Sequence, residues 1–142
     1  VLFSDPYYDS AQVAIVPADS TITSKDDLKG KKIGAQMGTT GETCANAIEG
    51  AQVQSVEDMG VIMETLKTGG IDAAILDISV AENYAATGKF KMLNGSLLDE
   101  NVYVIAKEGN TELMTPINKA LAAFLASDDF KTYKAKWINS AK

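Results

Sequence analysis

Residues 71–76, with the sequence IDAAIL, form an almost unbroken apolar run between two segments of helical character. A short apolar run in this setting is typical of a strand that is buried on both faces, as in a parallel sheet. The preceding residues 56–70 repeat apolar side chains at helical spacing, and residues 77–88 form a further helix pattern that ends at Gly88. The run therefore predicts an α/β fold.

The same alternation of strands and helices extends over most of the chain. Further strands are predicted at residues 12–17, 31–36, 52–56, 90–93 and 101–106, and a further helix at residues 40–48. Strands that alternate with helices imply a parallel or mixed sheet with right-handed crossovers.

The end of the chain differs, because two helices follow Asn110 with no strand between them. We expect the first to begin at the pair Thr115–Pro116 and the second to be capped by Ser127. Apolar side chains form one stripe on each helix and need a surface to pack against.

The composition excludes several classes of function. The 142 residues carry a formal net charge of −6 without a basic cluster, which argues against nucleic acid as a partner. There is no histidine and no arginine, and Cys44 is the single cysteine. A Ser-His-Asp or Cys-His catalytic pair and a His- or Cys-based zinc site cannot form from this chain alone. We therefore expect no enzyme activity, no metal and no cofactor.

The turn Gly38-Thr39-Thr40-Gly41 follows the predicted strand 31–36 and opens the predicted helix 40–48. Backbone N–H groups at a helix N-terminus bind anions, including carboxylates. Gly38 lets the backbone approach an anion closely, and the two threonine hydroxyls add hydrogen bonds unless one of them only caps the helix. The pattern fits a small anion, and a capped helix start without a ligand remains the alternative.

A nucleotide phosphate fits this turn less well. The Gly-Lys-Ser/Thr sequence of a phosphate loop is absent, and Gln36 stands where a G-x-G-x-x-G fingerprint needs its first glycine. Glu57 lies at about the right separation for an acid that binds a ribose, so this alternative stays open.

Asp77 comes directly after the buried strand 71–76. Open α/β sheets bind ligands at the carboxyl ends of their strands, and the glycine-threonine turn also follows such an end. An anion-binding turn and a carboxylate at one sheet edge complement a small zwitterion. Asp77 could instead cap a helix that starts near residue 78, unless Ser79 takes that role.

Four motifs are spread in order over the whole chain: FSDPYY at 3–8, TSKDDLKGKKIGAQMGTTGE at 23–42, GGIDAAILD at 69–77 and VYVIAKEGN at 102–110. Together they resemble the solute-binding proteins of bacterial ABC importers, and most closely the polar amino-acid-binding group known as solute-binding family 3.

The resemblance implies a type II periplasmic-binding-protein-like α/β fold, in which two crossing strands join two lobes. Residues 1–11 would end lobe one and form the first crossing. Residues 12–103 would form a complete lobe two, a mixed sheet with flanking helices, and residues 104–142 would cross back and add the C-terminal helices to lobe one. Roughly the first third of a family member, including the arginine that usually clamps the ligand carboxylate, would then be missing. We expect the chain alone to bind amino acids weakly or not at all.

The resemblance also assigns the carboxylate side of a ligand site. Thr40 matches the position whose hydroxyl and amide contact the ligand carboxylate, and Gly41 follows it. Gly38 and Thr39 would shape the turn. On the other side, Asp77 matches the acid that receives the α-ammonium group. A further position, Gln36, matches a cleft-facing residue that helps to select the ligand side chain.

The implied function is binding of a small polar amino acid in the interlobe cleft for delivery to an ABC permease, without chemistry. A ligand-sensing receptor domain and, less favoured, a dehydratase on the same fold are the alternatives. The implied location is periplasmic or extracellular, with membrane attachment only through a lipid anchor outside this chain. The two final helices, without their usual partner, would fold back on lobe two, pair with another chain or fray.

Overall fold

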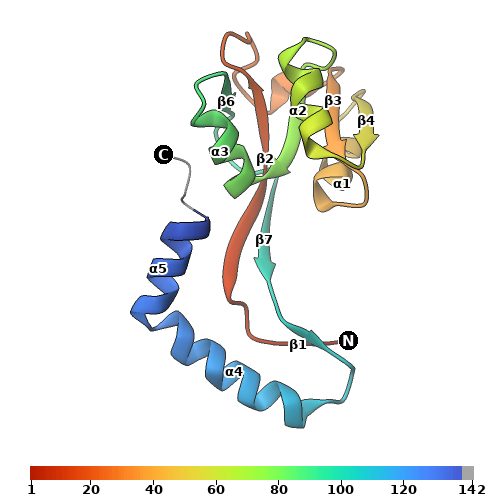
Figure 1. The fold of residues 1–142 in the computed structure, drawn as a ribbon. Coiled ribbons are helices and arrows are strands. Elements are labelled where there is room, and N and C mark those ends of the chain that lie inside the picture. The colour runs from red at the N-terminus through yellow and green to blue at the C-terminus, as the bar shows by residue number, and fades with distance from the viewer. Residues whose placement is uncertain (139–142) are drawn as a thin grey trace. The chain divides into compact units, whose positions relative to one another are not determined.

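The structure, a computed structural model, describes residues 1–138 and divides into two compact units. Unit 1 comprises Val1–Ser10 and the described residues from Glu100 onward, and unit 2 comprises Ala11–Asp99. Strands β2 (Tyr8–Pro17) and β7 (Leu98–Val102) each carry the chain from one unit into the other (Figure 1).

Unit 2 is built on a mixed sheet with the strand order β4-β3-β5-β2-β6, and β7 also pairs with β2. The strands not yet given are β3 (Lys32–Gln36), β4 (Gln52–Val56), β5 (Ala73–Asp77) and β6 (Phe90–Met92). Strand β3 is parallel to both β4 and β5, whereas β2 is antiparallel to β5 and β6. The mixed sheet and all four of these predicted strands are confirmed.

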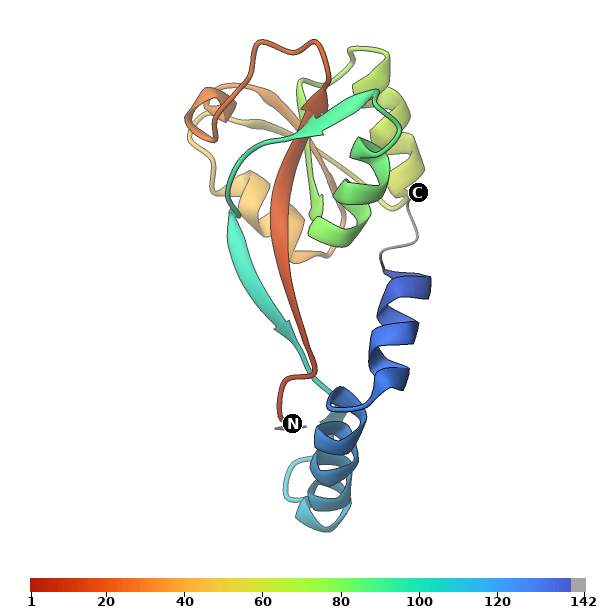
Figure 2. The ribbon, with the colours of Figure 1, turned by 90° about the vertical axis from the view of Figure 1, so that its left-hand side faces the viewer.

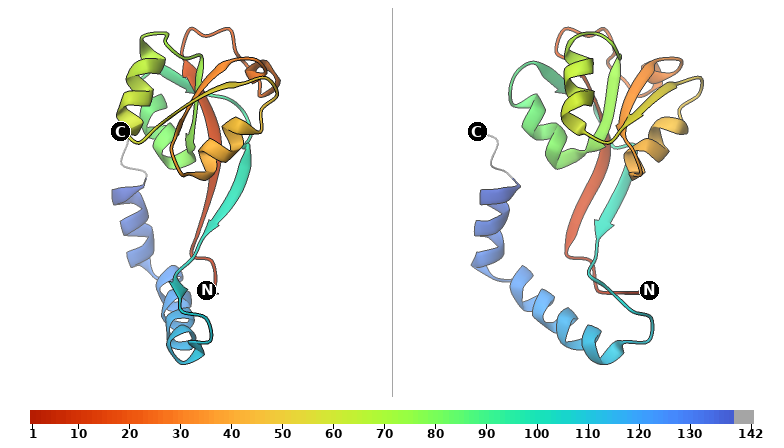
Figure 3. Two further views of the ribbon diagram at one scale, coloured as in Figure 1. Left: turned by 90° about the vertical axis from the view of Figure 1, so that its right-hand side faces the viewer. Right: turned by 45° about the vertical axis from the view of Figure 1, so that its right-hand side comes forward.

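Helices cover both faces of this sheet. They are the 3₁₀ turn η1 (Asp26–Leu28) and the helices α1 (Thr40–Asn46), α2 (Met59–Lys67) and α3 (Ile78–Ala85). Figure 2 shows α1 on one side of the sheet and α2 and α3 on the other, and the left view of Figure 3 shows the same layers from the opposite side. The sheet is thus enclosed between two helical layers.

The core of unit 2 consists of two apolar clusters, one on each face of the sheet. Successive side chains of a strand point to opposite faces, so Val13 and Ile15 of β2 join one cluster, and Ala14 and Val16 join the other. In β5 the residues 73–76 are all buried and alternate in the same way. The predicted double burial of this strand is confirmed. Burying one isoleucine such as Ile15 contributes about 2–3 kcal/mol.

Helix α2 approaches the sheet closely because β3 contains a glycine. A Cβ atom built on Gly34 would lie 2.6 Å from Ile71 Cδ1 and 2.7 Å from Ile62 Cγ2. The missing side chain at Gly34 therefore sets the depth at which α2 packs.

Helix α2 begins after Asp58, whose Oδ1 accepts hydrogen bonds from the amides of Gly60 at 2.6 Å and Val61 at 3.3 Å.

Unit 1 contains a two-stranded antiparallel pair, β1 (Leu2–Phe3) with β8 (Ile105–Ala106). The predicted single strand 101–106 is wrong, because this stretch is divided between β7 and β8. The two strands have different partners, β2 for β7 and β1 for β8. Between them the backbone of Val104 bonds to Ser4: its carbonyl accepts from the Ser4 amide, and its amide donates to Ser4 Oγ, each at 2.9 Å.

Two helices, α4 (Thr111–Leu125) and α5 (Asp128–Trp137), complete unit 1. The predicted start of α4 at Thr115–Pro116 is wrong, because the helix begins four residues earlier and encloses Pro116. The early turns are held by burial of Met114, which is 4% exposed, and Thr115 Oγ1 donates to the carbonyl of Thr111 at 2.9 Å. Capping of α5 by Ser127 is confirmed, since its Oγ accepts from the Phe130 amide at 3.3 Å.

The aromatic residues on α4 and α5 remain largely accessible. Phe124 packs edge-on against Phe130 with ring centroids 5.6 Å apart, yet Phe124 is 40%, Tyr133 52% and Trp137 68% exposed. Within residues 1–138, none of the helices combines the length and the apolar character that crossing a membrane requires.

Candidate functional site

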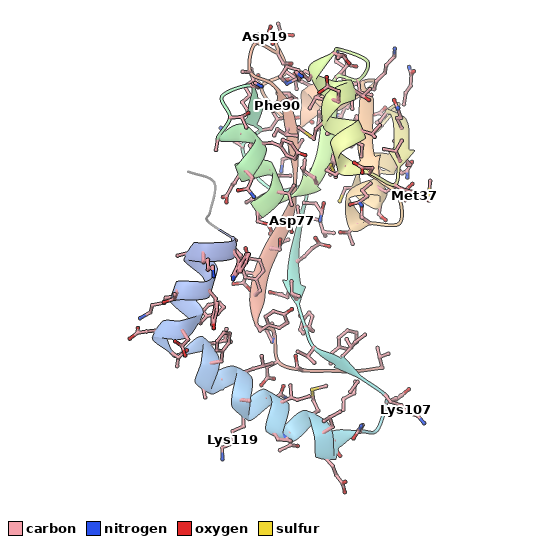
Figure 4. The ribbon with its side chains drawn as sticks, viewed as in Figure 1. Asp19, Met37, Asp77, Phe90, Lys107 and Lys119 are labelled. Carbon is pink, nitrogen blue, oxygen red and sulfur yellow. The ribbon has the colours of Figure 1, made fainter. Side chains whose placement is uncertain are left out.

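A pocket of about 150 Å³ lies in unit 2 at the carboxyl ends of β3 and β5. It is lined by Gln12, Gln36, Thr39, Met59, Ile75, Leu76, Asp77 and Val80. Figure 4 shows Asp77 at the same end of unit 2 as Met37, which follows β3, and Asp19 at the opposite end. The structure thus brings three of the predicted site residues, Gln36, Thr39 and Asp77, to one pocket.

The parallel pairing of β3 with β5 explains this convergence. Ala35 lies opposite Ile75, so the residues that follow each strand emerge at the same edge of the sheet. The next residue of β3 is Gln36, and β5 ends at Asp77. The positions of these side chains therefore follow from strand register.

The turn after β3 is shaped by one glycine and one threonine. Gly38 has φ +76°, in the left-handed region that favours glycine. Thr39 is the N-cap of α1: its Oγ1 accepts from the Glu42 amide at 3.3 Å and donates to the carbonyl of Gln36 at 2.8 Å. The sequence left open which threonine caps the helix; in the structure it is Thr39.

Glu42 closes the same turn, a role that the sequence analysis missed. Its Oε2 accepts from the Gly38 amide at 2.7 Å, while its own amide donates to Thr39 Oγ1. A hydrogen bond from the Ser55 hydroxyl, and then the one from the Gly38 amide, hold the pKa of Glu42 below its ordinary value. The pattern Thr-x-x-Glu, which is typical of a capping box, could have indicated this bond.

Two amides in the first turn of α1 lack an acceptor within the helix, as is usual at a helix N-terminus. Within residues 1–138, the N–H groups of Thr40 and Gly41 donate to no acceptor. Thr40 is exposed and Gly41 is buried, and neither residue belongs to the pocket lining, which ends at Thr39 in this turn. Such amides can hold a carboxylate.

Gly41 is needed here for close packing rather than for its backbone angles. A Cβ atom on Gly41 would lie 2.8 Å from Gln12 Oε1 and 3.1 Å from the carbonyl oxygen of Ile75. The first turn of α1 therefore lies directly on β2 and β5, and only a hydrogen atom fits between them.

Asp77 is half-buried and caps α3. Its Oδ1 accepts from the Ser79 amide at 2.8 Å and also from the Ser79 hydroxyl. The alternative in which Ser79 caps the helix is wrong, because α3 begins at Ile78, directly after β5, and leaves Asp77 at the N-cap position. The carboxylate reaches the pocket and can also accept hydrogen bonds from a cation.

Two glutamines complete the polar part of the pocket. Gln36 is half-buried, and its Nε2 donates to the carbonyl of Glu57 at 2.8 Å. Gln12, which the sequence analysis missed, is only 6% exposed and lies opposite Asp77 in the pairing of β2 with β5. Its polar side chain between Ala11 and the apolar residues 13–16 could have indicated it. No cluster of three or more metal-binding side chains is found among residues 1–138.

Comparisons of the sequence with known proteins identify one family. A family model described as "Bacterial extracellular solute-binding proteins, family 3" matches residues 1–140. A probable histidine-binding protein of Neisseria gonorrhoeae is 28% identical over 144 residues, which cover 96% of this chain and 54% of that protein. The arginine-binding extracellular protein ArtP of Bacillus subtilis is 28% identical, over 99% of this chain and 57% of ArtP.

Solved structures agree with the sequence relatives. A mutant of ArgBP from T. maritima superimposes with a TM-score of 0.86 at 30% identity, over 99% of this chain and 62% of that one. The arginine-, lysine-, histidine-binding protein ArtJ from Geobacillus stearothermophilus gives a TM-score of 0.78 at 31% identity, over 98% of this chain and 63% of that one.

The expected fold class, an α/β fold of the type II periplasmic-binding-protein kind, is confirmed by these neighbours. The chain spans between 54% and 63% of the length of the four proteins named here. Since the family model matches nearly the whole chain, this protein belongs to the bacterial extracellular solute-binding proteins of family 3.

Proposed function

We propose that this protein binds a small polar amino acid in a cleft between two lobes and delivers it to an ABC permease, with no chemistry on the ligand. Unit 2 is the lobe that closes over the ligand. Family membership supports this proposal, as do relatives named for binding histidine, arginine and cystine.

The observation that carries the proposal is that a carboxylate and a set of backbone N–H groups lie at the same edge of the sheet. Asp77 lines the pocket together with Gln36 and Thr39, and the amides of Thr40 and Gly41 follow Thr39 directly. A zwitterionic amino acid needs donors for its carboxylate and an acceptor for its ammonium group.

In the proposed complex the ligand carboxylate accepts from the Thr40 and Gly41 amides and from the Thr40 hydroxyl. The α-ammonium group donates to Asp77, and Gln36 contacts the ligand side chain. Burial of both ligand charges is tolerated because each meets a partner of opposite polarity. The turn that holds the amides is already closed by Glu42 before the ligand arrives.

Binding in this proposal works through closure of the two lobes. A ligand that contacts both lobes stabilises the closed form over the open one, and a permease then recognises the closed form. The proposed location is periplasmic or extracellular, and a lipid anchor would lie outside these residues.

The proposal is tested by titrating the ¹⁵N-labelled 142-residue protein with L-arginine and with L-histidine. Since this chain alone is expected to bind weakly, each ligand is added to high millimolar concentration, and we expect shifts of the Thr40, Gly41 and Asp77 amide resonances that approach saturation only there. L-arginine methyl ester, which lacks the free carboxylate, should leave Thr40 and Gly41 unshifted.

Two variants sharpen this test. Asp77→Asn keeps a capping oxygen for α3 but removes the charge, so it should abolish the shifts. Asp19→Asn is the matched control, because Asp19 lies at the opposite end of unit 2 (Figure 4) and should leave binding unchanged. Equal titration curves for Asp77→Asn and the unmodified protein would contradict the proposal.

A further inference from the structure

We propose that Gln12 is a positioning residue that sets the spacing between the first turn of α1 and Asp77. The inference rests on the proposed function for its effect on binding, and on the geometry of unit 2 for its structural part. Gln12 then acts on the ligand through the two groups that it holds apart.

Gln12 is unusual in its surroundings. Among residues 11–99 it is the only buried polar or charged residue, and its neighbours Ala11 and Val13 in β2 belong to the apolar core. A buried amide side chain is costly unless its polar atoms are satisfied, so such a residue in a strand needs a specific reason. An apolar residue of similar size would fill the same space without that cost.

The position of Gln12 supplies the reason. In the antiparallel pairing of β2 with β5 it lies directly opposite Asp77. Its Oε1 reaches the first turn of α1, where it lies 2.8 Å from the place that a Cβ atom of Gly41 would occupy. Gln12 therefore lies beside Asp77, the proposed acceptor of the ammonium group. Its side chain also reaches the first turn of α1, which carries the proposed donors to the carboxylate.

This link matters because the ligand allows no freedom in the spacing. The carboxylate and the ammonium group of an amino acid are attached to the same α-carbon, so their separation is nearly constant. A site that is misplaced by about 1 Å loses much of its complementarity. Gln12 is neutral, whereas a glutamate of the same shape would place a second negative charge beside Asp77.

The test compares Gln12→Met with Gln54→Met. Both substitutions replace an amide by an apolar chain of similar length, but Gln54 is exposed on β4 and does not line the pocket. Each ¹⁵N-labelled variant is titrated with L-arginine and L-histidine, and its ligand-free spectrum is compared with that of the unmodified protein. Partial loss of the spacing predicts an affinity about threefold to tenfold lower for Gln12→Met and an unchanged affinity for Gln54→Met.

The ligand-free spectra provide a readout that a general loss of stability would not produce. Gln12→Met should shift the amide resonances of both Gly41 and Asp77, whereas Gln54→Met should shift neither. If Gln12→Met does not fold, Gln12→Asn takes its place, because the shorter side chain withdraws its amide from Gly41 and should shift the same two resonances.

The outcomes separate the two proposals. If the unmodified protein gives no ligand shifts, the proposed function fails, and the ligand-free spectra alone decide whether Gln12 couples Gly41 to Asp77. If the unmodified protein binds and Gln12→Met binds equally well, with Gly41 and Asp77 unshifted, the role of Gln12 is overturned while the proposed function stands.

Discussion

Replacement of Asp77 separates its role as a helix cap from its proposed role as a charge. Asp77→Ala removes the Oδ1 atom that accepts the Ser79 amide at 2.8 Å and the Ser79 hydroxyl. Loss of an N-cap costs about 1 kcal/mol, and we expect the upper part of the 0.5–2 kcal/mol range because the site is half-buried. Asp77→Asn keeps a capping oxygen, so it should cost about 0.5 kcal/mol or less, mainly from the lost interaction of a charge with the helix dipole.

The assay is urea unfolding followed by far-ultraviolet circular dichroism, together with the thermal midpoint. For a chain of 142 residues, 1 kcal/mol corresponds to a shift in Tm of about 3 °C. Asp19→Ala serves as the matched control, since Asp19 is exposed and should change stability by about 0.5 kcal/mol or less. Equal losses for Asp77→Ala and Asp77→Asn, or no loss for either, would refute the assignment of Asp77 as the cap of α3.

Two further predictions concern residues that support the site. Gly34→Ala should lower the free energy of unfolding by about 1–3 kcal/mol, because its methyl group would meet Ile71 Cδ1 and Ile62 Cγ2 within 2.7 Å. The measurement is urea unfolding. An unchanged urea midpoint would show that α2 can move away from the sheet at no cost. Because the pKa of Glu42 is lower in the folded protein than its ordinary value of 4.5, its stabilising contribution is present above that pH and is lost as the pH falls through the lowered pKa. Glu42→Gln should therefore flatten the decline of stability on acidification below about pH 4.5; parallel pH profiles for both proteins would contradict this.

Much of unit 2 could be predicted from local sequence patterns. The apolar run of residues 71–76 indicated a strand buried on both faces, and alternate burial of residues 73–76 is what the structure shows. The glycine-threonine turn and Asp77 could be recognised because each stands at the carboxyl end of a predicted strand. The roles assigned to Gln36, Gly38, Thr39, Thr40, Gly41 and Asp77 in ligand binding stay predictions.

Two errors, the single strand at residues 101–106 and the start of α4, depend on contacts with distant parts of the chain. The stretch 101–106 is apolar enough for one strand, but it is divided because its first residues, in β7, pair with β2 and its last residues, in β8, pair with β1. Helix α4 begins before Pro116, and its early part is held by the burial of Met114. No local pattern contains this information.

The amino-acid sequence by itself determined most strands and helices of unit 2 and which polar residues stand at strand ends, since periodicity and turn chemistry act over a few residues. Only the tertiary structure decided that Gln12 faces Asp77 across β2 and β5 and that Gly41 packs on both strands. The pairing of strands that are more than 50 residues apart depends on the summed burial of whole faces, and single residues do not encode it.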